Sequence, residues 1–151
     1  MEKMTNYDYR LAKNRIRHAC RYHVVWCSTF RRSVLTEPIK ARLRELVEEV
    51  CHEKDMTVLG LDIGPNFVYL YADMPPMDAV NNMVRSIKRK TASVLVKEFP
   101  ELRSRLSSLW TLHYFVSTEK EKPEEEIKAW METQPRFAPK KPKKEGMPNG
   151  E

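Results

Sequence analysis

The chain has 151 residues, of which 41% are hydrophobic and 32% are charged. This composition is ordinary for a globular protein, and the length suits one domain with tails. No apolar run approaches the ~18 residues that a membrane span needs, and the first residues lack the apolar core of a signal peptide. We therefore expect a cytoplasmic protein with no membrane partner.

The positive charge is concentrated at the two ends of the chain. The net charge is +6 overall, +6 over residues 1–35, −3 over residues 36–134 and +3 over residues 135–151. A polyanion is the natural partner of such ends, because each phosphate contact releases condensed counterions. A solubilising surface with a basic tail would give the same charges, so charge alone does not distinguish a nucleic-acid partner from a role in solubility.

The cysteines and histidines show no metal-ligand spacing; they are Cys20, Cys27, Cys51, His18, His23, His52 and His113. Three cysteines are an odd set, which favours reduced thiols in a cytosol over a disulfide framework. These residues predict no cofactor and no metal site.

The first half of the chain predicts a strand, a helix and a hairpin. Residues 22–27 are apolar, aromatic and β-branched, which is typical of a strand. Thr36 precedes an acid and a proline, which indicates a helix start, and apolar residues recur at helical spacing to about residue 53. Residues 56–63 and 67–72 read as strands around a glycine-proline turn.

The second half predicts a helix over residues 77–99, a strand over 109–118 and a helix over 123–134. Together the elements match an α+β, ferredoxin-like split βαβ plan: a four-stranded antiparallel sheet with two helices on one face, plus a C-terminal helix. We divide the chain into a basic segment (1–20), a folded domain (21–134) and a basic, disordered tail (135–151).

Several motifs recur in the order and spacing of one known family. They are Tyr-His-Val-Val-Trp-Cys at 22–27, Phe-Arg-Arg at 30–32, Lys-Glu-Phe-Pro-Glu-Leu at 97–102, Leu-Trp at 109–110, Tyr-Phe-Val-Ser-Thr at 114–118 and Met-Glu-Thr-Gln at 131–134. Over residues 14–136 the chain resembles the single-tyrosine HUH transposases of the TnpA type. Those enzymes move small insertion sequences as single-stranded DNA, so the resemblance implies a transposase fold.

The resemblance also marks three changed positions. The family carries two histidines and a glutamine that hold a divalent cation, and a tyrosine that attacks the phosphodiester. Here Phe67 and Tyr69 stand at the histidine positions, Trp130 stands at the tyrosine position, and Gln134 is retained. Phenylalanine has no donor atom, a neutral tyrosine is a poor ligand for a hard cation, and indole has no hydroxyl. We therefore predict no catalytic residue, no metal and no enzyme activity.

Two further expectations follow from the same comparison. The three aromatic side chains are expected to pack together and fill the vacated site. Residues 119–123 occupy a link where the family usually has glycines, and losing glycine while gaining Pro123 stiffens a hinge.

Basic residues are the better functional candidates. Arg85, Lys88 and Arg89 are spaced i, i+3, i+4 on the helix over 77–99, and this spacing predicts one face away from the apolar stripe. The resemblance adds the N-terminal cations Arg15, Arg17, Arg21, Arg31 and Arg32, because the family binds hairpins of folded single strands. It also implies a homodimer. Hairpin recognition combines phosphate contacts with stacking of unpaired bases.

We therefore predict a catalytically inactive, TnpA-like protein that binds a hairpin in single-stranded DNA or RNA. Two alternatives stay open: an active DNA transposase that uses unconventional residues, and a protein-interaction module without nucleic acid. The sequence does not show whether the partner is DNA or RNA, or which nucleotide sequence is bound. It also does not identify the biological role or membership of a larger complex.

Overall fold

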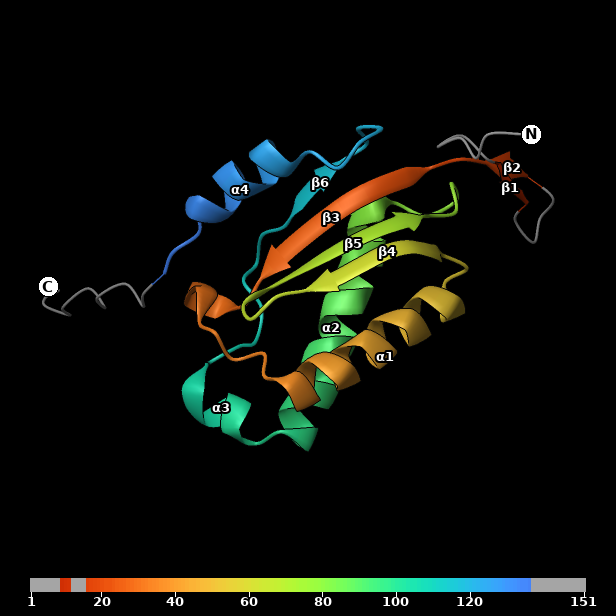
Figure 1. Cartoon of the computed structure of the whole chain (residues 1–151). Coiled ribbons are helices and arrows are strands. Elements are labelled where there is room, and N and C mark those ends of the chain that lie inside the picture. Colours follow the sequence, from red (N-terminus) through yellow and green to blue (C-terminus); the bar gives the residue numbers. More distant parts are fainter. Residues whose placement is uncertain (1–8, 12–15, 137–151) are drawn as a thin grey trace, which may run out of the picture.

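The computed structural model of the protein describes residues 9–11 and 16–136 and confirms the predicted α+β plan (Figure 1). A four-stranded antiparallel sheet has the strand order β4-β5-β3-β6. The elements in chain order are β1 (Arg10–Leu11), β2 (Arg17–His18), β3 (Arg21–Cys27), the 3₁₀ turn η1 (Thr29–Arg31), α1 (Glu37–Glu53), β4 (Thr57–Ile63), β5 (Phe67–Asp73), α2 (Val80–Glu98), α3 (Glu101–Arg105), β6 (Phe115–Ser117) and α4 (Glu124–Glu132).

The register between β3 and β5 divides their side chains between the two faces of the sheet. Val24 lies opposite Leu70, and Val25 lies opposite Tyr69. Successive side chains of a strand point to opposite faces, so Val24 and Leu70 share one face while Val25 and Tyr69 share the other. Both faces are covered, which explains why β3 reads as a continuous apolar run.

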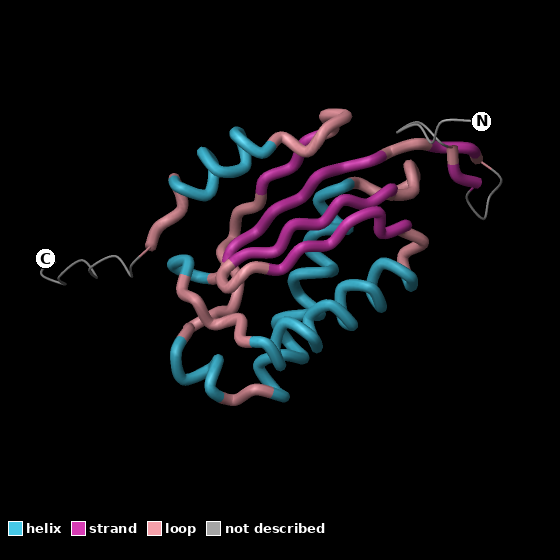
Figure 2. Tube along the Cα trace, in the orientation of Figure 1, coloured by secondary structure: helices cyan, strands magenta, loops and turns pink. Residues whose placement is uncertain are grey.

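The helices α1 and α2 cover one face of the sheet and form the main core with it (Figure 2). At the end of this core the rings of Trp26 and Trp110 meet edge to face with centroids 6.0 Å apart. The Trp110 indole donates a hydrogen bond to the Thr91 hydroxyl at 3.0 Å. This bond satisfies the one polar atom of a buried tryptophan.

The helix α4 lies over the opposite face of the sheet, where a second and smaller core forms. We call it the α4-side cluster. Its buried members are Val25, Tyr69 and Ile127, with Phe67, Tyr71, Phe115, Trp130 and Met131 packed against them. The sheet therefore separates two cores.

The structure corrects several predicted boundaries. The strand predicted over residues 109–118 is reduced to Phe115–Ser117, with one isolated bridge between Ser28 and Trp110. The helix predicted from residue 77 begins at Val80. Thr36 is the N-cap of α1 as predicted, although its side chain makes no capping bond. The ribbon of β1 with β2 and the helix α3 were not predicted.

Part of the predicted architecture falls where the structure gives no description. Of the tail predicted over 135–151, residues 137–151 lie outside the described residues. Within the described part of the chain, no helix is both long and apolar enough to cross a membrane.

Candidate nucleic-acid interface

The structure brings Phe67, Tyr69 and Trp130 together in the α4-side cluster, as their predicted packing requires. Phe67 and Tyr69 lie two residues apart on β5 and therefore project from the same face. Trp130 reaches that face from α4, with its ring centroid 6.0 Å from that of Phe115. The three positions thus belong to one apolar cluster, but they do not fill the site completely, because a pocket of about 300 Å³ lined by Phe67 and Tyr69 remains beside α4.

The hydroxyl of Tyr69 is engaged by His23. The Nε2 of His23 lies 2.8 Å from the carbonyl oxygen of Glu119, which can only accept a hydrogen bond. In a neutral imidazole Nδ1 is then an acceptor, so the Tyr69 hydroxyl donates to it at 2.8 Å. Burial raises the pKa of Tyr69 to about 12, which keeps the hydroxyl neutral at physiological pH. His23 therefore has a structural role, because it contacts both Tyr69 and the carbonyl of Glu119.

The link between β6 and α4 is tied to the sheet at two points. His23 holds the carbonyl of Glu119, and the ammonium of Lys122 lies 4.2 Å from the ring centroid of Tyr69. The second contact has the geometry of a cation–π interaction. These contacts restrain residues 119–123 beyond the stiffness that Pro123 supplies.

Acid is expected to weaken this arrangement through His23. Burial lowers the pKa of His23 below its ordinary value of 6.5. Lys122 also lowers this pKa, whereas the hydrogen bond with the Glu119 carbonyl raises it. As pH falls below 6.5, the unfolded chain takes up a proton before the folded chain does, so the free energy of unfolding falls. Urea unfolding at pH 7.5 and 5.5 should show a smaller difference in His23→Leu than in the exposed control His113→Leu. Equal differences would contradict this role.

Gln134 is buried beside α4, with 7% of its surface exposed. Its Nε2 donates to the Thr133 hydroxyl at 3.2 Å. Its Oε1 is buried without a hydrogen-bond partner among the described residues. A metal would need further ligands, and the side chains at positions 67 and 69 offer an apolar ring and a committed hydroxyl.

A groove of about 300 Å³ runs between α2 and residues 108–114. We call it the α2 groove. Arg85 and Arg89 line it and are exposed, as predicted from their spacing. Leu112, the most exposed large apolar side chain in the described residues, at 92%, lies on its other wall. Two guanidinium groups thus face an exposed apolar residue.

Lys88 does not join Arg85 and Arg89 on an open face, which corrects the prediction. Its ammonium donates to the carbonyl oxygens of Thr111 at 2.7 Å and His113 at 3.2 Å. Burial lowers the pKa of Lys88 to about 8. Lys88 therefore shapes the wall of the α2 groove, and its bonds divert residues 111–113 from the strand predicted there.

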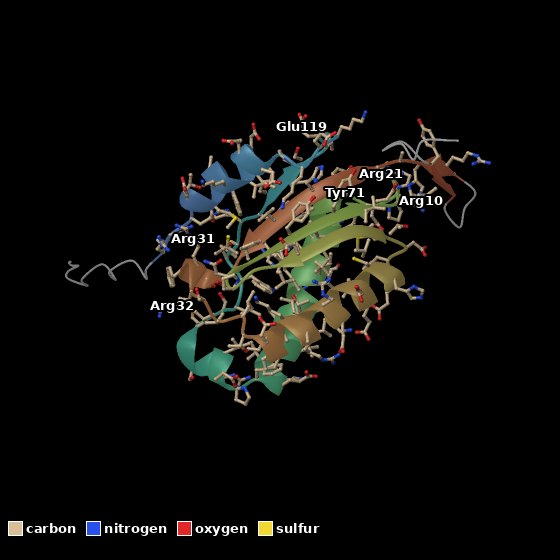
Figure 3. The ribbon with its side chains drawn as sticks, viewed as in Figure 1. Arg10, Arg21, Arg31, Arg32, Tyr71 and Glu119 are labelled. Carbon is tan, nitrogen blue, oxygen red and sulfur yellow. The ribbon has the colours of Figure 1, made fainter. Side chains whose placement is uncertain are left out.

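The N-terminal cations do not form one surface. Figure 3 places Arg10 and Arg21 toward one end of the sheet and Arg31 and Arg32 toward the other. Arg17 and Arg32 are exposed, and Arg15 lies outside the described residues.

Arg21, predicted as a nucleic-acid contact, is instead part of a buried ion pair. Its side chain is 9% exposed and its Nε donates to Oδ2 of Asp73 at 3.1 Å. The other carboxylate oxygen, Oδ1, lies 2.9 Å from Nδ1 of His18. We assign Arg21 a structural role, because the pair joins β3 to β5 and anchors β2.

Sequence reasoning missed the side chains that complete the α2 groove. Tyr114 lines it and donates its hydroxyl to Oδ1 of Asn81 at 2.9 Å. Trp110 and Ser108 contribute from the same segment. A strand over 109–118 would have placed Trp110 and Tyr114 on one face of the sheet rather than in a loop against α2; the polar pair Ser107-Ser108 just before it was the local signal for a loop.

A family model described as "Transposase IS200 like" matches residues 16–134. The chain belongs to the IS200-like transposase family. The ISDra2 transposase TnpA of Deinococcus radiodurans is 24% identical over 136 residues, which cover 89% of this chain and 91% of that relative. The resemblance identified from the motifs is thereby confirmed.

Two solved transposase structures share the fold. A transposase structure from Deinococcus radiodurans superposes with a TM-score of 0.74 at 23% identity, covering 91% of this chain and 100% of that one. A REP-associated tyrosine transposase bound to a REP hairpin superposes with a TM-score of 0.52 at 13% identity, covering 85% and 67%. At these identities the likeness establishes the fold alone.

Proposed function

We propose that this member of the IS200-like transposase family binds a hairpin of single-stranded nucleic acid in the α2 groove and does not cut it. The observation that carries the proposal is the pairing of exposed Arg85 and Arg89 with exposed Leu112 across that groove. Guanidinium groups suit phosphate oxygens, and an exposed apolar side chain suits an unpaired base. The related transposase solved with a REP hairpin supports the same class of ligand.

The identity and environment of three residues support binding without cleavage. Phe67 and Trp130 lack an atom that can bind a cation or attack phosphorus. Tyr69 has a hydroxyl, but that hydroxyl donates to His23, and burial raises its pKa to about 12. A weakly acidic, hydrogen-bonded phenol is a poor nucleophile.

The proposal includes a homodimer in the cytoplasm. The strand β6 pairs with β3 on one side and forms an edge of the four-stranded sheet. An edge strand offers unpaired backbone groups to a second copy, and Val116 on it is 39% exposed. The free thiols of Cys20, Cys27 and Cys51 suit a reducing compartment.

Incubation of the purified protein with a DNA hairpin carrying single-stranded flanks, with Mg²⁺ or Mn²⁺, tests the proposal. We expect salt-dependent binding, no nicked product and no covalent protein–DNA adduct, with the Deinococcus radiodurans TnpA as the cutting control. An RNA hairpin of the same sequence separates the two nucleic acids. Nicking that is lost in Tyr69→Phe would establish an active enzyme. No binding to either hairpin at low salt would favour a protein-interaction module.

A further inference from the structure

Lys88 holds a tight turn in the wall of the α2 groove. Its ammonium donates to the backbone carbonyls of Thr111 at 2.7 Å and His113 at 3.2 Å. The residue between these two carbonyls is Leu112, whose side chain is 92% exposed. The nitrogen of Lys88 therefore lies at the base of the turn that presents Leu112 to the groove.

Further bonds fix this turn. The backbone N–H of Thr111 donates to the carbonyl of Cys27 at 3.1 Å, and the Thr111 hydroxyl donates to the carbonyl of His113 at 3.2 Å. A wall that is ordered in advance loses little conformational entropy when a ligand binds. The fold thus sets the position of the Lys88 nitrogen relative to Leu112 without help from a ligand.

The amine of Lys88 has the environment of a nucleophilic lysine. An ammonium has three N–H donors, and two of those of Lys88 have hydrogen-bond acceptors in the part of the chain that the structure describes. Burial lowers the pKa of Lys88 to about 8. The neutral amine keeps two N–H groups for the two carbonyls and gains a lone pair. Desolvated lysines of this kind attack carbonyl carbons and form imines.

Arg85 and Arg89 place two exposed cations on the same wall of the groove. With Lys88 they are spaced i, i+3, i+4 on α2, so the three side chains are neighbours on the helix surface. A nucleic-acid strand carries one phosphate on each side of a sugar, and guanidinium groups suit those phosphates. A sugar whose two phosphates contact the arginines lies next to the lysine.

The exposed side chain of Leu112 favours a sugar that has lost its base. An apolar side chain on a fixed turn can occupy the space of a missing base, as apolar wedges do when they enter a base stack. An abasic deoxyribose opens to a free aldehyde at its C1′ carbon. An intact nucleotide has no such aldehyde, because its C1′ is bonded to the base. Lys88 therefore has a carbonyl carbon to attack only at an abasic position.

We propose that the α2 groove captures an abasic deoxyribose of a DNA strand through Lys88. The amine attacks the C1′ aldehyde, a C–N bond forms, and the aldehyde oxygen leaves as water with the two amine protons. One amine and one aldehyde thus give one imine and one water, so the step needs no oxidant or reductant. The capture of a strand rests on the proposed function, because the groove must first hold that strand.

The test treats the full chain with two probes and cyanoborohydride, which reduces an imine to a stable amine. One probe is a DNA hairpin with a single abasic deoxyribose, and the other is 2-deoxyribose 5-phosphate, which carries the aldehyde without a strand. We expect Lys88→Arg to lower the yield of both adducts about fivefold or more, because a guanidinium keeps the charge but is not a nucleophile. Lys90→Arg is the matched control and should leave both yields unchanged, since Lys90 pairs with Glu49 at 3.5 Å and does not line the groove.

Peptide mapping by mass spectrometry separates this inference from the proposed function. A wild-type adduct located on Lys88 supports the inference, and an adduct of the sugar phosphate there supports it even if no hairpin binds. Adducts spread evenly over the lysines, or yields that Lys88→Arg leaves unchanged, overturn it. Binding of the intact hairpin in the α2 groove would stand in that case, because it needs no aldehyde.

Discussion

Replacing Arg85 and Arg89 together with alanine is expected to weaken hairpin binding about tenfold to a hundredfold at ~0.1 M salt. Both guanidinium groups are exposed and line the α2 groove, so the fold should not need them. Each lost phosphate contact should lower the slope of log affinity against log salt by about 1. Fluorescence anisotropy over a salt series measures both effects.

Two control variants sharpen this prediction. Arg103→Ala removes an exposed arginine of α3, outside the α2 groove, and should leave the salt slope unchanged. Lys88→Met should lower stability by roughly 1–3 kcal/mol, because the carbonyls of Thr111 and His113 lose their donor. A slope that falls as much in Arg103→Ala as in the double variant would place binding elsewhere.

Replacing Asp73 with alanine is expected to destabilise the fold by about 3–5 kcal/mol. The carboxylate is fully buried, contacts Arg21 on one oxygen and His18 on the other, and so joins β5 to β3 and β2. Its removal leaves a buried cation and a buried imidazole without the acceptor that both contact. Urea unfolding monitored by circular dichroism measures the loss.

Asp62→Ala is the matched control for Asp73. Asp62 lies on β4 of the same hairpin but is exposed, so its replacement should change stability by less than about 0.5 kcal/mol. Equal unfolding midpoints for the two variants would show that the buried pair contributes nothing. Local sequence does not distinguish these two acids, since both stand near strand ends.

Local patterns were sufficient to predict most of the architecture. The helix α1 has an acid, a proline and a regular apolar stripe, and the β4–β5 hairpin has its turn residues, so each is specified by neighbours in sequence. The strand predicted before β6 was wrong because the backbone there is held by Lys88, more than 20 residues earlier, through the carbonyls of Thr111 and His113. A tertiary bond of this kind leaves no periodic mark in the sequence.

The candidate site residues also differ in whether local sequence or a distant contact determines their environment. The exposure of Arg85 and Arg89 followed from helical spacing, because their own helix determines it. The burial of Arg21 depends on Asp73, 52 residues away, and no spacing rule reaches that far. The position of Arg31 depends on a left-handed turn at Phe30 and Arg31, which the side-chain types do not encode.

The presence of two cores on opposite faces of one sheet has a consequence for how this chain tolerates change. The main core holds α1 and α2 to the sheet, while the α4-side cluster shares no member with it. Free-energy changes at sites without common contacts add independently. We therefore expect substitutions on the α4 face to leave the main core, which holds the chain folded, largely unchanged. In a scaffold of this kind, one set of substitutions can alter the site on one face, and a different set can alter the stability that the other face provides.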